Sequence, residues 1–95
     1  MGNLSARIWV QNSTEKPRIV WVEPCAEDFT LLAGEELEII ARSSTEQPWF
    51  YVVEWPESTQ VYLEGESAAY EVVQNGIHLE CGHNRKAACD AGLKL

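Results

Sequence analysis

The tightest constraint on the fold is an alternation of apolar and polar side chains in the middle of the chain, at residues 29–41. Leu37 and Ile39 alternate there with glutamates, a period of two that fits a half-buried strand and no helix. Gly34 divides the stretch and can adopt the positive φ that the third residue of a type II turn requires. We therefore predict two strands joined by a corner or a wide hairpin, because two-residue hairpins prefer Asn-Gly or Gly-X at the turn.

Similar short runs recur along the whole chain and are separated by clusters of turn-forming residues. Asn75-Gly76 gives the clearest local signal, because this dipeptide between alternating runs is typical of a two-residue hairpin. The hairpin then joins strands at residues 70–74 and 77–81, and in this register Val73 faces His78. The other strands are predicted at residues 4–11, 18–23, 49–55 and 59–64. About eight short strands at intervals of roughly ten residues predict an all-β fold, an antiparallel β-sandwich, in a single domain spanning residues 1–95.

The C-terminal residues 82–95 differ from the rest of the chain in charge. They carry three Lys/Arg and one Asp, whereas residues 1–81 carry four Lys/Arg and fourteen Asp/Glu. The overall net charge of −8 disfavours direct binding to nucleic acid or to anionic lipid. Within this basic tail, Asn84 as a cap and Gly92 as a terminator predict a short helix over residues 85–91.

The cellular location is predicted from what the sequence lacks. No apolar run is long enough for a transmembrane helix, and the N-terminus lacks the charged and apolar regions of a signal peptide. The three cysteines, Cys25, Cys81 and Cys89, are an odd number that fits a closed disulfide framework poorly and is typical of reduced thiols. We therefore expect a cytoplasmic protein without membrane contact.

Two runs are apolar on both faces, residues 18–22 and residues 48–53. A two-layer sandwich covers one face of each sheet, so the second face of these strands should meet the basic tail folded over them, a second copy of the chain, or another protein. The predicted core consists of Trp21, Leu37, Ile39, Trp49, Tyr51, Val53, Val61, Val72 and Leu79. The predicted interface, on the opposite faces, consists of Trp9, Val20, Val22, Phe50 and Val52. We expect a homodimer that Val22→Lys or Phe50→Lys weakens without unfolding the chain.

A metal site is the main alternative for the C-terminal segment, where His78, Cys81, His83 and Cys89 lie close together. Zinc prefers four N or S ligands, usually in closely spaced pairs, and the spacing H-x2-C-x-H-x5-C contains no clean pair. Blue copper usually needs a second upstream histidine and an axial methionine, but no histidine precedes His78 and Met1 is the only methionine. We therefore expect no cofactor and keep zinc or copper binding at these residues as the alternative.

The segment LLAGEELEI, residues 31–39, resembles the L-x-(P/A)-G-E-x-(L/V)-x-(I/V) corner of bacterial immunoglobulin-like and cupredoxin-like sandwiches. The whole chain also resembles small uncharacterised bacterial all-β proteins. The resemblance implies an immunoglobulin-like or cupredoxin-like fold and no particular activity.

The sequence contains none of the common motifs for nucleophilic, metal-dependent or nucleotide-dependent catalysis. Exposed aromatic side chains on an acidic body are instead typical of a surface that binds another protein. We therefore expect a non-enzymatic protein-protein interaction module. Two alternatives remain, a cupredoxin-like metal-binding protein and an acidic inhibitor that mimics the charge of nucleic acid.

Overall fold

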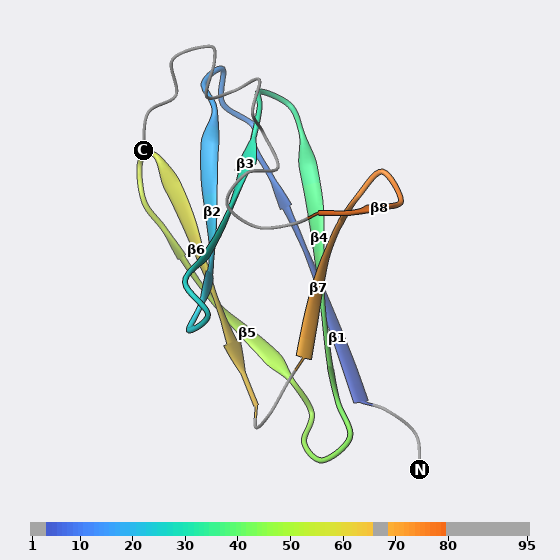
Figure 1. The fold of residues 1–95 in the computed structure, drawn as a ribbon. Helices are drawn as coiled ribbons and strands as arrows, with labels where there is room; N and C mark the ends of the chain where they lie inside the picture. Colours follow the sequence, from blue (N-terminus) through green and yellow to red (C-terminus); the bar gives the residue numbers. More distant parts are fainter. Residues whose placement is uncertain (1–3, 66–68, 80–95) are drawn as a thin grey trace.

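The computed structural model describes residues 4–65 and 69–79, which form two four-stranded β-sheets (Figure 1). The strands are β1 (Leu4–Gln11), β2 (Arg18–Glu23), β3 (Glu27–Leu31), β4 (Glu36–Ser43), β5 (Trp49–Glu54), β6 (Ser58–Glu64), β7 (Ala69–Gln74) and β8 (Ile77–His78). One sheet has the order β1-β4-β7-β8 and the other the order β3-β2-β6-β5. The prediction of an all-β chain is confirmed for this part, and the predicted helix at residues 85–91 lies outside it.

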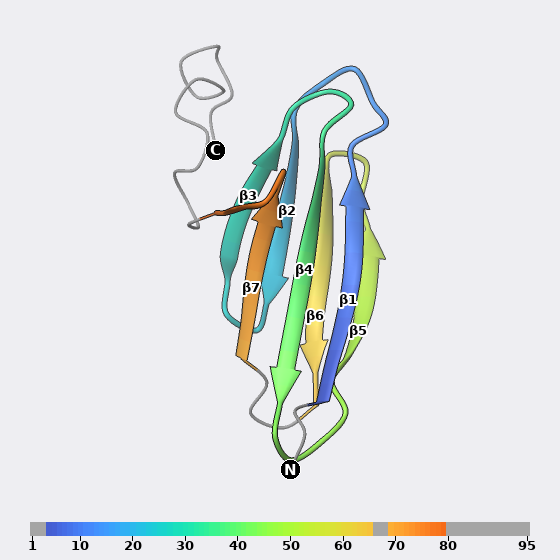
Figure 2. The same cartoon turned by 90° about the vertical axis from the view of Figure 1, so that its right-hand side faces the viewer.

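The two sheets pack face to face around a shared core, as in a β-sandwich. Figure 2 shows the two layers, with β7, β4 and β1 in front of β3, β2, β6 and β5. Leu37 and Ile39 enter the core from one sheet, and Val22 and Val61 enter it from the other. The buried core residues are Val10, Val20, Val22, Phe29, Leu31, Leu37, Ile39, Val61 and Val72.

The central turn is the predicted corner, and it carries the chain from one sheet to the other. Gly34 has a φ of 80°, and the N–H of Glu35 donates to the carbonyl of Leu32 at 3.0 Å, as in a type II turn with glycine in third position. The carboxylate of Glu35 also accepts the N–H of Leu32 at 2.7 Å. Because β3 and β4 belong to different sheets, this turn is a corner and not a hairpin.

Asn12 ties the loop between β1 and β2 to this corner, although it is polar and completely buried. Its Nδ2 donates to the carbonyls of Lys16 at 2.7 Å and Leu31 at 3.0 Å. Its Oδ1 accepts hydrogen bonds from the backbone N–H and the hydroxyl of Thr14, and its own carbonyl accepts the N–H of Gly34. All the hydrogen-bonding capacity of the amide is therefore used within the fold.

One sheet is mixed, which corrects the prediction of a purely antiparallel sandwich. β2 and β6 run parallel, with Val20 opposite Thr59 and Val22 opposite Val61, while the other paired strands are antiparallel. Strand direction depends on contacts between segments that are far apart in sequence. The alternation within each run carries no information about those contacts.

The β7–β8 hairpin confirms the predicted register, with Val73 opposite His78 and a two-residue turn at Asn75 and Gly76. Both turn residues have positive φ, 53° and 78°, as a type I′ turn requires. The two strands remain hydrogen-bonded beyond His78, because the N–H of Leu79 donates to the carbonyl of Val72 at 2.9 Å. The rest of the strand predicted to end at residue 81 lies outside the described residues.

The structure reverses the predicted faces of β2 and β5. Val20 and Val22, predicted in an outer interface, are completely buried, and Val22 lies opposite Val61 on the inner side of the sheet. Trp49 and Tyr51, predicted in the core, are 55% and 57% exposed. Both strands are apolar on both faces, so their alternation could not identify the inner one. Assigning the larger rings to the core was wrong.

The predicted interface is therefore not one surface. Phe50 and Val52 lie on the inner side of β5, where Phe50 packs against the core and Val52 is 39% exposed because β5 is an edge strand. Trp21 and Val53, predicted in the core, lie partly buried on the outer side. Only Trp9, on the outer side of the other sheet, is more than half exposed as predicted.

Shortening a core side chain of β4 should destabilise the fold strongly. Leu37→Ala or Ile39→Ala should each lower the free energy of unfolding by about 2–5 kcal/mol, because each removes buried methyl groups and leaves a cavity. Urea denaturation followed by circular dichroism measures this change. The matched control is Ile77→Ala, since Ile77 is 66% exposed and its loss should change stability by less than about 0.5 kcal/mol. A loss below about 1 kcal/mol at both core positions would contradict their assignment.

Candidate functional site

The outer face of the β3-β2-β6-β5 sheet carries most of the chain's large aromatic side chains. Three of the four tryptophans and two of the three tyrosines lie there. They point outward because side chains alternate along a strand and the neighbouring positions, such as Val22 and Val61, point into the core. We call this surface the aromatic face, and its rings are Trp21, Trp49, Tyr51, Trp55 and Tyr62.

Three of these rings, Trp49, Tyr51 and Trp55, are more than half exposed. Tyr51 lies opposite Tyr62 in the β5–β6 ladder, and their ring centroids are 6.0 Å apart with an interplanar angle of 53°. This tilted contact is one of the favourable arrangements for two aromatic rings. Single exposed apolar residues are common on protein surfaces, whereas several large exposed rings on one sheet face are unusual.

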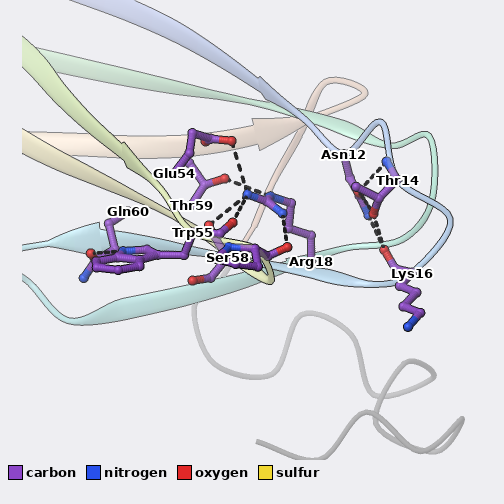
Figure 3. Close-up of polar contacts among 10 residues, drawn as sticks. Asn12, Thr14, Lys16, Arg18, Glu54, Trp55, Ser58, Thr59 and Gln60 are labelled. Atoms are coloured by element: carbon purple, nitrogen blue, oxygen red, sulfur yellow. Dashed lines mark hydrogen bonds and ion pairs between the residues drawn. The ribbon is translucent and has the colours of Figure 1, made fainter.

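Hydrogen bonds fix Trp55 on the aromatic face (Figure 3). Its indole Nε1 donates to Oε1 of Gln60 at 2.6 Å, and Nε2 of Gln60 donates to Oε2 of Glu23 at 3.4 Å. Gln60 lies between buried Thr59 and Val61 on β6, so its side chain points outward. The ring of Trp55 therefore lies against the outer side of the sheet, although this residue follows the end of β5.

Arg18 lies on the inner side of the sheet and holds the turn that contains Trp55 (Figure 3). The side chain of Arg18 is only 9% exposed, and its Nε donates to the hydroxyl of Thr59 at 3.0 Å. Its other guanidinium nitrogens donate, at distances from 2.7 to 3.1 Å, to the carbonyls of Trp55, Pro56 and Ser58. One buried guanidinium thus satisfies three carbonyls of a single turn, which makes Arg18 a positioning residue for Trp55.

Each of three rings on the aromatic face has a carboxylate directly across from it on the neighbouring strand. The pairs are Asp28 with Trp21, Glu23 with Tyr62, and Glu64 with Trp49. Within residues 4–65 and 69–79 these three carboxylates form no ion pair. The aromatic face is therefore both apolar and negatively charged.

The outer face of the other sheet has a different character, because its charges compensate one another. Glu71 pairs with the guanidinium of Arg42 and, at 2.9 Å, with Nδ1 of His78, while Arg7 pairs with Glu38 at 3.4 Å. The hydrogen bond from Arg42 is the main reason why the pKa of Glu71 lies below its usual value. We call this surface the charged face, and such exposed pairs stabilise a fold only weakly.

Trp9 lies at one end of the charged face, beside a shallow hollow of about 380 Å³. The hollow lies between β1 and the β7–β8 turn, and its lining includes Trp9, Glu36, Glu38, Gln74 and Asn75. One of its carboxylates, that of Glu38, is already paired with Arg7. The hollow has the volume of a small-ligand site, but it lacks the apolar lining typical of one.

Cys25 does not have the properties of a reactive nucleophile. It lies exposed in the turn between β2 and β3. Partial burial of its thiol, followed by the nearby carboxylates of Glu27 and Glu23, raises its pKa above the usual value. Thiolate is the nucleophilic form, so these surroundings disfavour reaction at this position.

Of the predicted metal ligands, only His78 belongs to the described residues. Its imidazole is 70% exposed and pairs with Glu71 on the charged face. Cys81, His83 and Cys89 lie outside this part of the chain. Within residues 4–65 and 69–79, no group of three or more His, Cys, Asp or Glu side chains is placed to hold a metal ion.

The sequence contained a signal for the aromatic face that was assigned to the wrong side. The alternate spacing of Trp49, Tyr51 and Trp55 places three rings on one side of the predicted strand at residues 49–55, and the prediction that this side faces the core is wrong. Arg18 alternates in step with Val20 on β2 and lies on the inner side of the sheet, although arginine is usually exposed. The burial of this arginine depends on the turn after β5, which local sequence does not reveal.

Comparison of the chain with protein-family models, curated proteins and solved structures gave no significant match. Within the described ranges, the chain contains no helix with the length and apolar character needed to cross a bilayer.

Proposed function

We propose that this chain is a small, non-enzymatic interaction module that recognises a protein partner through its aromatic face. The observation that carries the proposal is the grouping of five large rings on one outer sheet face, three of them more than half exposed. Tryptophan and tyrosine are enriched at the centres of protein interfaces, where they contribute a large share of the binding energy. The anchored ring of Trp55 and the paired rings of Tyr51 and Tyr62 limit the entropy that such side chains lose on binding.

The proposal includes a cytoplasmic location and an immunoglobulin-like or cupredoxin-like fold. The location is supported by the three cysteines, an odd number that fits a closed disulfide framework poorly and is typical of reduced thiols. The fold family follows from the corner at residues 31–39, which adopts the type II turn that its glycine favours.

Capture from a native lysate tests the proposed surface if matched variants are compared. A variant carrying both Trp49→Ser and Tyr51→Ser should lose the proteins that the wild type retains, because it removes two exposed rings of the aromatic face. Trp9→Ser is the control, since it removes an equally exposed ring from the charged face. Quantitative mass spectrometry measures the difference. Equal retention by the wild type and the double variant would reject the aromatic face as the binding surface.

A second copy of the chain is the other candidate occupant of an apolar outer face. An isologous dimer would bury the same rings twice. Sedimentation at micromolar concentration of the wild type and of the Trp49→Ser and Tyr51→Ser double variant distinguishes self-association from binding of a different protein. A wild-type dimer that becomes a monomer in the double variant would assign the aromatic face to self-association.

A further inference from the structure

We propose that the aromatic face binds an extended basic segment of a partner protein, whose Arg or Lys side chains occupy three sites along the sheet. This inference rests on the proposed function and adds the chemistry of the partner. Each site is one of the cross-strand pairs described above, which we call the acid–aromatic pairs: Asp28 with Trp21, Glu23 with Tyr62, and Glu64 with Trp49.

An acid–aromatic pair can contact one cationic side chain in two ways at once. A guanidinium or ammonium group is attracted to the face of an aromatic ring within about 6 Å of its centroid. Residues directly opposite in a ladder have Cβ atoms about 4.5–5.5 Å apart, so the same cation can reach the carboxylate beside the ring. Arginine is best suited, because its planar group stacks on the ring while its N–H groups donate to the carboxylate.

The spacing of the three pairs suits an extended chain. Each successive acid–aromatic pair lies one strand further across the sheet and two residues further along the strands. The step along β2 runs from Trp21 to Glu23, and the step along β6 runs from Tyr62 to Glu64. With about 4.8 Å between strands and about 3.3 Å per residue, successive pairs lie about 8 Å apart. Alternate side chains of an extended segment are about 7 Å apart on one side, so long basic side chains can reach consecutive pairs.

The charges of the described residues favour a cationic occupant over a neutral or acidic one. The three carboxylates are acceptors with no ion partner among these residues, while Arg7, Arg18 and Arg42 pair with carboxylates elsewhere. The neutral amide of this face, on Gln60, already bonds to Trp55 and Glu23. A neutral or sugar-like ligand would leave the carboxylates unpaired, and an acidic ligand would be repelled.

Fluorescence anisotropy with synthetic peptides tests this inference on the full chain. The probe is a fluorescein-labelled octapeptide with Arg at alternate positions and Ser between them, and its Glu and Asn counterparts are the comparison peptides. We expect the Arg peptide alone to bind, with an affinity that falls as salt rises. Combining Glu23→Gln with Glu64→Gln should weaken its binding about fivefold, since two partly exposed carboxylates that would pair with the cations are lost.

The control variant combines Glu15→Gln with Glu36→Gln, which removes the same net charge at exposed positions away from the aromatic face. Its affinity for the Arg peptide should equal that of the wild type. Equal weakening in both double variants would reveal general charge attraction and overturn the inference. Equal binding of the Arg and Asn peptides would also overturn it, while the proposed function would still be decided separately by capture with the Trp49→Ser and Tyr51→Ser variant.

Two further outcomes would identify a different occupant. If the Arg peptide binds only after Arg85→Glu and Lys86→Glu, the chain's own C-terminal residues occupy the aromatic face, which overturns the assignment to a partner. If no peptide binds and the wild type forms a dimer that the Trp49→Ser and Tyr51→Ser variant loses, a second copy occupies it, which overturns the inference as well.

Discussion

Replacing Arg18 by Met should lower the free energy of unfolding by about 3–5 kcal/mol, although the substitution keeps most of the side-chain volume and increases its apolar character. The guanidinium is almost completely buried and donates to the carbonyls of Trp55, Pro56 and Ser58. Methionine cannot donate, so the carbonyls of Trp55 and Pro56 would lose this donor in a partly buried turn, while the carbonyl of Ser58 would keep the backbone N–H of Trp55. Each buried polar group left unsatisfied costs about 1–3 kcal/mol.

The control for this prediction removes the ion pair of Arg18 but keeps the rest of its contacts. Glu54 accepts from the guanidinium at 3.2 Å, but its side chain is 65% exposed, so Glu54→Gln should cost less than about 1 kcal/mol. Urea denaturation of both variants measures the two effects. A loss below about 1 kcal/mol for Arg18→Met would mean that the turn after β5 is held by other contacts.

Much of the strand pattern follows from local sequence, because turn residues and alternation act over a few positions. The bounds of β1 and β2 agree with those predicted, since polar turn formers follow Gln11 and a proline follows Glu23. Gly34 indicated a corner, and the structure has one there. Asn75-Gly76 indicated the hairpin and its register. Each of these features is determined by the conformational preferences of one or two residues.

The order and direction of the strands could not be predicted in the same way. β2 lies beside β6 and parallel to it, although roughly forty residues separate them, and such pairing depends on the whole set of packed faces. The inner faces of β2 and β5 depend on the same long-range packing. Arg18 can occupy an inner position because its guanidinium donates to the carbonyls of the turn after β5, a contact that is not visible from β2 alone.

For β2 and β5, the sequence shows that both faces are apolar but not which face lies outside the core. The apolar character of residues 18–22 and 48–53 on both faces correctly indicated that one face would remain outside the core. Alternation gives two possible faces and does not identify the one that packs into the core. The core instead takes the smaller side chains Val20, Val22 and Val61, which meet across the mixed sheet, so the large rings remain outside.

This reversal leads to a pair of substitutions with opposite expected results. Val22→Lys should unfold the chain, because it places an ammonium group with no partner at a position that is completely buried. Its cost should exceed about 5 kcal/mol, which is comparable to the total stability of a small domain. Tyr51→Lys should leave the chain folded, because Tyr51 is 57% exposed and the variant loses mainly the contact with Tyr62, worth about 0.5–1.5 kcal/mol.

Circular dichroism and thermal unfolding distinguish these results directly. If the inner and outer faces were those predicted from sequence, Val22→Lys would only weaken a dimer and Tyr51→Lys would disrupt the core. Under the faces in the structure, Val22 lies opposite Val61 in the core, and an ammonium group there cannot reach water without opening the two sheets. A cooperatively folded Val22→Lys protein beside an unfolded Tyr51→Lys protein would reverse the assignment of the two faces, and would remove the aromatic face from the surface of the molecule.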